Sequence, residues 1–302
     1  MTVVTLSGHD VELAKSRAYC TEITRTQAKN FYYGLKLLPE PKRSAMYALY
    51  AYMRLVDDIA DAEDGRSKER RIADLERWRT VTHAALAGEA VGGGELVWPA
   101  FGDMARTYAV PVNIFDDMIA GQRQDLEPVA IETFQELYDY CYRVASVVGL
   151  ASIYVWGFER EGGAARETEK LAVERGIALQ LTNVLRDLCE DAGKGRVYVP
   201  AEDLRRFGVA REDLAAGKGG EKFRAMMQFE MARAEGFYQS SAALEGRVTA
   251  DSRATLWAMT EIYHGLLRKM TKDPERVLRG RVSLSVLEKL LIGWRAMRGK
   301  GR

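Results

Sequence analysis

Three aspartates crowd little more than one helical turn in the stretch RLVDDIAD, which covers residues 54–61. Side chains three and four residues apart share a helix face, so Asp57, Asp58 and Asp61 repel one another by roughly 0.2–0.5 kcal/mol per pair. A carboxylate cluster of this kind is often a solvated face. The apolar run over residues 45–53 that precedes it indicates a buried helix instead, in which a bound cation would offset the repulsion.

A second acidic segment, QLTNVLRDLCED over residues 180–191, closes another apolar helical pattern. Its polar side chains are spaced three, four and four residues apart and share one helical stripe: Gln180, Asn183, Asp187 and Asp191. Apolar residues crowd both sides of this stripe, which places it toward the interior, where unpaired amides and carboxylates are costly. A buried polar network is one interpretation of the pattern, and a bound metal ion is the other.

The two segments together indicate a chemistry that neither indicates alone. Mg²⁺ takes oxygen ligands and is usually bound through one or two carboxylates together with substrate phosphates. Two acidic stripes that face each other across a helical cavity would hold several Mg²⁺ ions and, through them, a diphosphate. Departure of diphosphate from an allylic carbon generates a carbocation, so we expect the rest of the cavity to be apolar and free of water.

Helices must position both segments, because apolar residues recur every three or four residues through most of the chain and strand-like alternation is rare. We predict an all-α protein, a single-domain helical bundle around a central apolar cavity, over residues 1–302. Disorder is expected within residues 1–20, and a basic tail over residues 295–302. The predicted helices cover residues 12–30, 41–62, 67–87, 95–108, 112–126, 133–158, 164–192, 221–245, 250–272 and 283–298.

Composition argues against several classes of protein. The chain has 302 residues, 47% of them hydrophobic, which is enough for a sizeable core. Its 44 basic and 43 acidic residues leave a net charge of +1, which gives no support to a nucleic-acid partner. The three cysteines are odd in number and far apart, which favours a reducing compartment over a disulfide framework. No signal-like start or membrane-length apolar run is visible, so we expect a cytoplasmic protein.

At the two acidic segments the sequence resembles the squalene/phytoene synthase family, the head-to-head prenyl synthases. The family's first motif, an aromatic residue and an arginine followed by D-D-x-x-D, is matched by Tyr50, Arg54, Asp57, Asp58 and Asp61. Its second motif, Q-x-x-N-x-x-R-D-x-x-E-D followed by a basic residue and a tyrosine, is matched by Gln180, Asn183, Arg186, Asp187, Glu190, Asp191, Arg196 and Tyr198. A helix with the family's Y-x-x-A-x-x-V-G pattern lies between them at residues 142–149.

The resemblance implies an isoprenoid synthase fold and a role for each matching residue. Two to three Mg²⁺ ions would be held by the carboxylates Asp57, Asp58, Asp61, Asp187, Glu190 and Asp191. Diphosphate would be bound by Arg54, Arg186, Arg196, Tyr198 and Arg281, and by Asn30, which stands where many relatives carry serines. Gln180 and Asn183 would bind near the reacting carbons. Tyr50 and Tyr142 would face the carbocation, which aromatic rings attract by about 0.5–2 kcal/mol.

The family reaction, as the resemblance implies it, begins with ionisation of one allylic diphosphate. The double bond of a second substrate attacks the cation, and proton loss closes a cyclopropyl diphosphate. Phe31, Leu35 and Tyr47 lie on the segment expected to form the wall of the tail pocket. Two bulky aromatics there favour two farnesyl diphosphates as substrates and presqualene diphosphate, a precursor of squalene and hopanoids, as the product. Two geranylgeranyl diphosphates, giving phytoene for carotenoids, are the alternative.

Other functions and partners stay open at the level of sequence. A terpene cyclase, a chain-elongating prenyltransferase and a non-catalytic assembly factor share the helical architecture. No nucleotide fingerprint is visible, so the sequence does not support NADPH as a cofactor. The basic amphipathic end over residues 284–302 is typical of a last packing helix or of peripheral contact with the inner face of an anionic membrane. Downstream enzymes of the isoprenoid pathway are the expected protein partners.

Overall fold

Helices form nearly the whole of the structure. The computed structural model describes residues 8–28, 30–61, 64–89, 91 and 94–300, except for the side chains of His9, Asn30, Asp61 and Lys300. In these described residues the one β-type pairing is an isolated antiparallel bridge between Phe158 and Val248. The predicted all-α fold class is confirmed, and the single-domain organisation stays a prediction.

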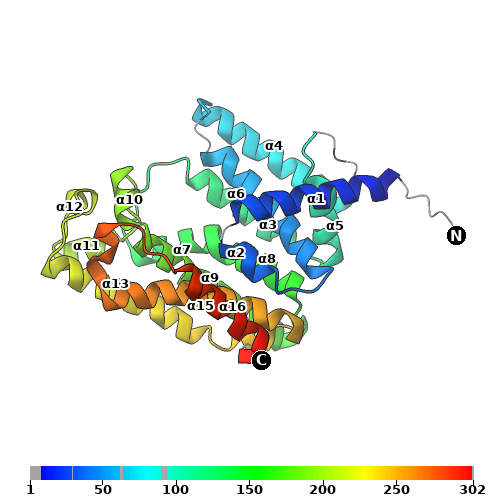
Figure 1. The fold of residues 1–302 in the computed structure, drawn as a ribbon. Coiled ribbons are helices and arrows are strands. Elements are labelled where there is room, and N and C mark those ends of the chain that lie inside the picture. Colours follow the sequence, from blue (N-terminus) through cyan, green and yellow to red (C-terminus); the bar gives the residue numbers. More distant parts are fainter. Residues whose placement is uncertain (1–7, 29, 62–63, 90, 92–93, 301–302) are drawn as a thin grey trace.

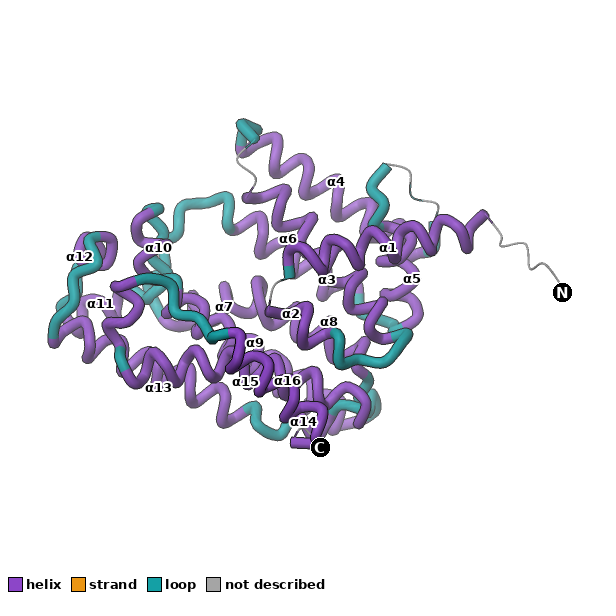
Figure 2. Tube along the Cα trace, viewed as in Figure 1, coloured by secondary structure: helices purple, strands orange, loops and turns teal. Residues whose placement is uncertain are grey.

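The helices fall into two groups, each around its own apolar core (Figures 1 and 2). The first group comprises α1 (Gly8–Gln27), α3 (Lys42–Asp61), α4 (Lys68–Ala87), α5 (Trp98–Thr107), α6 (Val112–Gln124) and α8 (Val147–Trp156). The second comprises α7 (Phe134–Cys141), α9 (Gly162–Arg186), α10 (Leu188–Gly193), α11 (Ala201–Phe207), α12 (Arg211–Ala215), α13 (Glu221–Ser240) and α15 (Ala250–Lys272). In Figure 1, α1 and α3–α6 lie at the top, and α9, α13 and α15 lie at the bottom.

Shorter elements connect and cover these groups. They are α2 (Asn30–Leu35), the π-helical η1 (Tyr142–Ser146), α14 (Leu244–Arg247), the 3₁₀ helix η2 (Pro274–Arg279), α16 (Val286–Arg295) and the π-helical η3 (Ala296–Lys300). Helix α16 packs along α15 (Figure 1). None of the described helices is long and apolar enough to cross a lipid bilayer.

The predicted helices agree with the structure except at local points. Residues 8–20 belong to α1, so the disorder expected within residues 1–20 does not extend over them. The predicted helix over 133–158 contains the π-helical turn η1, and the predicted helix over 164–192 is divided into α9 and α10. Short helices such as α2, α11 and α12 were not predicted, because five to seven residues are too few to show helical periodicity.

The division between α9 and α10 falls at Asp187, one of the aspartates of the second acidic segment. Its backbone dihedrals of φ −98° and ψ 6° leave the helical range, although its N–H still donates to the Asn183 carbonyl at 2.9 Å. The Asp191 N–H in turn donates to the Asp187 carbonyl at 2.9 Å. The acidic stripe is therefore bent at its centre rather than continuous, and the bend sits at a carboxylate that binds two arginines, as described below.

Helix α9 approaches η1 very closely through Gly176. A Cβ atom added there would lie 2.4 Å from the Ser146 Cα and 2.8 Å from its backbone nitrogen. The Ser146 hydroxyl donates to the Val173 carbonyl at 2.8 Å across the same contact. Two backbones can pack at this distance only where one of them lacks a side chain.

We expect Gly176→Ala to lower the free energy of unfolding by about 3 kcal/mol, because the clash is with backbone that cannot yield easily. The matched control is Gly236→Ala in α13, where an added Cβ meets nothing within 4 Å. That change should stabilise the protein by about 0.5–1 kcal/mol through helix propensity. Urea unfolding followed by circular dichroism measures the free energy of unfolding of each variant. Equal changes in the two variants would contradict the close contact.

Candidate active site

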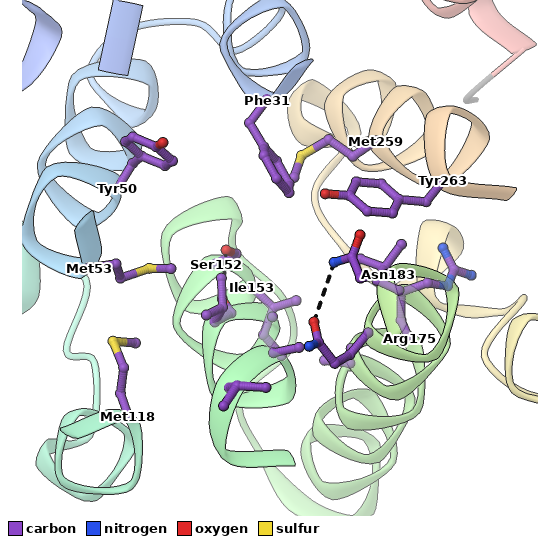
Figure 3. A pocket seen from close by; sticks show the side chains of 18 of the residues that line it. Phe31, Tyr50, Met53, Met118, Ser152, Ile153, Arg175, Asn183, Met259 and Tyr263 are labelled. Atoms are coloured by element: carbon purple, nitrogen blue, oxygen red, sulfur yellow. Dashed lines mark hydrogen bonds between the residues drawn. The ribbon is translucent and has the colours of Figure 1, made fainter. Parts of the chain in front are cut away.

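A cavity of about 420 Å³ lies between the two groups of helices. Side chains from α2, α3, α6, η1, α8, α9, α14 and α15 line it, and Figure 3 shows many of them from close by. Most of its wall is apolar, with Met53, Met118, Ile153, Leu179 and Met259 among the lining residues. The predicted central apolar cavity is therefore present.

Helix α3 presents one face to the first core and the opposite face to the cavity. Tyr52 is fully buried, stacks on Phe101 at 4.0 Å between ring centroids, and has its hydroxyl 2.9 Å from Thr82 Oγ1. These contacts of Tyr52 fix the orientation of α3. Its other face, at three- and four-residue spacing, contributes Tyr50, Met53, Arg54 and Asp57 to the cavity wall.

Helix α9 contributes the facing wall. The residues of its cavity stripe are Ala172, Arg175, Gly176, Leu179, Gln180 and Asn183. The Asn183 side-chain amide donates to Gln180 Oε1 at 3.3 Å, which is the dashed contact in Figure 3. Both acidic segments thus border one cavity, from different helices. The first contributes Arg54 and Asp57, and the second contributes Gln180 and Asn183.

One arginine, Arg54, pairs with two aspartates of the first acidic segment from within the same helix. Arg54 Nη1 donates to Asp57 Oδ2 at 3.0 Å, and Arg54 Nη2 also bonds to Asp58. All three side chains are a little over one third exposed, so the pairs are accessible to solvent and to a ligand. The side chain of the third aspartate, Asp61, lies outside the described part of the structure.

The carboxylates of the second acidic segment lie among basic side chains. Asp187 Oδ1 accepts from Arg186 Nε at 2.8 Å and from Arg281 Nε at 3.0 Å. Burial, together with the neighbouring carboxylates of Asp187 and Glu190, raises the pKa of Asp191 to about 6. The partly buried position of Asp191 beside other carboxylates is a setting in which a bound cation would stabilise the charged form.

The other predicted ligands lie near this segment or beside the cavity. Glu190 is exposed and accepts from Lys194 Nζ at 2.9 Å, and the charge of Arg196 acts to lower the pKa of Asp191. Tyr198 is buried and stacks on Tyr140 at 4.9 Å. The Tyr142 hydroxyl, at the start of η1, donates to Asp117 Oδ2 at 3.1 Å. The predicted ligand roles of Glu190, Arg196 and Tyr198 stay predictions, as does that of Asn30, whose side chain is not described. Tyr142 is not among the described residues that line the cavity, and its predicted contact with the carbocation also stays a prediction.

Of the three residues predicted for the tail pocket, Phe31 lines the cavity. Leu35 is 2% exposed and packs in the first core. Tyr47 is 6% exposed and stacks on Tyr32 at 5.9 Å between ring centroids. Neither Leu35 nor Tyr47 is among the described residues that line this cavity, so a part for them in tail binding stays a prediction.

The donor set fits a hard cation although no preformed metal cluster is present in the part of the chain described. Within that part, no group of three or more His, Cys, Asp or Glu side chains lies close enough together to hold a metal ion. Asp57 and Asp187 are instead paired with Arg54 and Arg186. The ligands available are nonetheless carboxylate and amide oxygens, the type that Mg²⁺ takes. Asp57, Asp61, Asp187 and Asp191 would hold the ion.

Buried polar atoms without a hydrogen-bond partner gather at the cavity. Four of them belong to residues in its wall: Arg54 Nε, Gln122 Oε1, Trp156 Nε1 and Asn183 Oδ1. Buried polar atoms in native proteins nearly always have a partner, so such atoms indicate a bound molecule or ordered water. Their position around one cavity supports a polar ligand there.

Sequence reasoning missed several residues of this wall. Gln122, Trp156 and Tyr263 line the cavity from α6, α8 and α15. Arg175 lines it from α9, and its charge on the apolar face of a predicted helix was a signal that could have identified it. For Gln122, Trp156 and Tyr263 the chain offered no such signal, because each fits an ordinary amphipathic helix.

Comparisons with known proteins agree with this architecture. The model of the squalene/phytoene synthase family matches residues 24–288. The 15-cis-phytoene synthase of Synechococcus elongatus is 35% identical over 284 residues, which cover 91% of this chain and 91% of that protein. A solved dehydrosqualene synthase in complex with a ligand has a TM-score of 0.83 at 28% identity, covering 96% of this chain and 98% of that one. Squalene synthase HpnC from Alicyclobacillus acidocaldarius has a TM-score of 0.78 at 27% identity, and the match covers 87% of this chain and 95% of that one.

The family match includes both acidic segments and every described residue of the cavity wall. Its members are prenyltransferases that use prenyl diphosphates as substrates. Two charged segments that border one apolar cavity are what such a substrate requires, since it has a charged head and a hydrocarbon tail. The chain therefore belongs to the squalene/phytoene synthase family and is a head-to-head prenyltransferase.

Proposed function

We propose that the protein condenses two farnesyl diphosphates head to head and releases diphosphate, with presqualene diphosphate as the product. The observation that carries this proposal is the single cavity bordered by both acidic segments, through Arg54 and Asp57 on α3 and Gln180 and Asn183 on α9. Its charged rim suits a diphosphate, and its apolar interior suits a prenyl tail. An ordinary solvated acidic face would not border such an interior.

Substrate binding requires the arginines to change partners. Arg54 and Arg186 now bond to Asp57 and Asp187, and their guanidinium groups match phosphate oxygens as well as carboxylates. A divalent cation, on which the family typically depends, would neutralise the carboxylates when bound and stabilise the departing diphosphate. The aspartates would then release the arginines, which would bind the diphosphate oxygens.

The interior of the cavity suits a carbocation once diphosphate has left. Tyr50, Phe31 and Tyr263 present aromatic rings in its wall, and ring faces attract positive charge by about 0.5–2 kcal/mol. Phe31 and Tyr263 lie 5.6 Å apart between ring centroids, so they cover one side together. Methionine and aliphatic side chains make up most of the remaining wall, and such a surface offers no hydrogen bonds to water, which would trap the cation as an alcohol.

The length of the cavity supports a farnesyl tail. The stripe of α9 that lines it extends over the twelve residues from Ala172 to Asn183, which is about 16 Å of helix. An extended prenyl chain gains roughly 5 Å per isoprene unit at about 1.5 Å per bond, so a farnesyl tail measures about 15 Å and a geranylgeranyl tail about 20 Å. The solved dehydrosqualene and squalene synthases with similar folds agree with this choice.

A second candidate is the condensation of two geranylgeranyl diphosphates to phytoene. A different observation favours it, since the Synechococcus elongatus protein that is 35% identical over 284 residues is a 15-cis-phytoene synthase. Both candidates use the same charged groups and differ only in the length of tail the cavity must accept.

Incubation of the purified protein with Mg²⁺ and either farnesyl or geranylgeranyl diphosphate, without NADPH, distinguishes them. Mass analysis of the extracted lipid should show a C30 cyclopropyl diphosphate from the farnesyl substrate. A C40 hydrocarbon formed only from geranylgeranyl diphosphate would establish the second candidate. If C15 alcohols or cyclic hydrocarbons were the sole products, head-to-head coupling would be wrong.

We expect Asp57→Asn to lower kcat/KM at least about 100-fold, because the change keeps the shape of a metal-binding carboxylate but removes its charge. Asp103→Asn is the matched control. Asp103 is 36% exposed and pairs with Arg17 at 2.8 Å, much as the 37% exposed Asp57 pairs with Arg54. Steady-state kinetics should give near-normal activity for the control, and equal losses in the two variants would count against a role for Asp57 in the site.

We also propose that α16 rests on an anionic membrane surface. Six large apolar side chains of α16 and the following η3 are 46–77% exposed: Val286, Leu287, Leu290, Leu291, Trp294 and Met297. Helix α16 packs on α15, yet none of its own residues is buried, so packing alone does not account for its exposed apolar side chains. Lys289, Arg295 and Arg298 supply positive charge beside this apolar face, as in helices that lie in the interface of anionic bilayers.

Co-sedimentation with lipid vesicles tests this surface. The protein should bind vesicles that contain phosphatidylglycerol and bind pure phosphatidylcholine weakly, and Leu287→Glu with Leu290→Glu should abolish binding. The control is Leu96→Glu, since Leu96 is 51% exposed but lies far from α16 in the sequence. Dimerisation through α16, detected by sedimentation velocity and lost in the double variant, would instead assign the surface to a second copy.

A further inference from the structure

A charged side chain is built into the apolar cavity, away from its acidic rim. Arg175 lines the cavity from α9 and is 4% exposed (Figure 3). It lies eight residues from Asn183 on the same helix, which is about 12 Å from that end of the site. The residues around this far end include Ala172, Leu244 and Leu256.

Every N–H group of the Arg175 guanidinium has an acceptor. Nε donates to the Ser241 hydroxyl at 2.9 Å, and Nη2 donates to the Ser241 carbonyl at 2.9 Å and to Glu245 Oε2 at 3.2 Å. Nη1 donates to Glu245 Oε1 at 2.6 Å and also bonds to the Thr260 hydroxyl. One arginine thus ties α9 to the turn after α13, to α14 and to α15, and we call this group of four residues the Arg175 clamp.

The clamp holds the elements that close the far end of the cavity. Leu244 precedes Glu245 on α14, and Thr260 lies one turn from Leu256 on α15; Leu244, Leu256 and Thr260 all line the cavity. A second set of bonds fixes the opposite side, where the carbonyl of the lining residue Trp156 accepts from Lys42 Nζ at 2.7 Å and from Ser252 Oγ at 3.0 Å. The far end is therefore held by directional bonds as well as by apolar packing.

We propose that the Arg175 clamp sets the greatest length of prenyl tail that the cavity accepts. An end formed only by leucine and methionine side chains would yield to a longer tail by changes of rotamer. Moving α14 away from α9 would instead break the bonds of a buried guanidinium and leave Glu245 without its partner, which is strongly unfavourable. The inference rests on the proposed function, because it concerns the tail of the substrate bound at the acidic rim.

The test is the ratio of kcat/KM for geranylgeranyl diphosphate to that for farnesyl diphosphate. In the variant Arg175→Met with Glu245→Gln, the clamp is removed without leaving an unpaired charge. We expect this ratio to rise at least about tenfold. Apolar pockets discriminate between substrates that differ by a methylene group on this scale. Thr260→Val, which removes a single acceptor of the clamp, should shift the ratio in the same direction by less and keeps the test open if the double variant folds poorly.

A matched control separates tail length from general loss of stability. Arg233 on α13 forms another buried cluster, at 2.8 Å from Asp203 and 2.7 Å from Glu230, and does not line the cavity. Arg233→Met with Glu230→Gln should lower the melting temperature but leave the ratio unchanged. An unchanged ratio in the Arg175 variants as well would overturn the inference. Failure of the unaltered protein to consume either substrate would instead refute the proposed function.

Discussion

Carboxylates at the edge of an apolar cavity need counter-charges, and this requirement shapes the site more than any other interaction. Burying a charge without a partner is costly, so each acidic segment here carries its own arginine. Arg54 holds Asp57 from one turn earlier on α3, and Arg186 with Arg281 holds Asp187 at the end of α9. The arrangement gives these aspartates a counter-charge in the substrate-free protein, and a diphosphate and its cation would engage the same groups.

The same requirement is met at the bend of the acidic stripe. The break in helical dihedrals at Asp187 coincides with bonds from Arg186 and Arg281 to its carboxylate. Burial, with the charges of Asp187 and Glu190, raises the pKa of Asp191 to about 6. The close contact of Gly176 with η1 fixes the opposite part of α9, so the charged and the apolar parts of the site are held by one helix.

Sequence reasoning identified the helices and the acidic motifs because both leave periodic signals. The apolar spacing of α3 and the Gln180, Asn183 and Asp187 spacing of α9 follow directly from helical geometry. The placement of Tyr47 and Leu35 away from the described cavity wall was not predictable, since core and pocket residues have the same apolar character. Arg175 was visible in the sequence, but its partners Ser241, Glu245 and Thr260 are far along the chain and are brought to it only by the packing of α13, α14 and α15.

The central claim is that the cavity between the two acidic segments binds a diphosphate together with a divalent cation. Calorimetric titration of inorganic diphosphate into the protein, with and without Mg²⁺, measures this without any turnover. The account predicts tight binding only when both are present, because the carboxylates repel diphosphate until a cation neutralises them, and each ligand should strengthen the other equally. Diphosphate that bound equally well without Mg²⁺, or that did not bind at all, would contradict it.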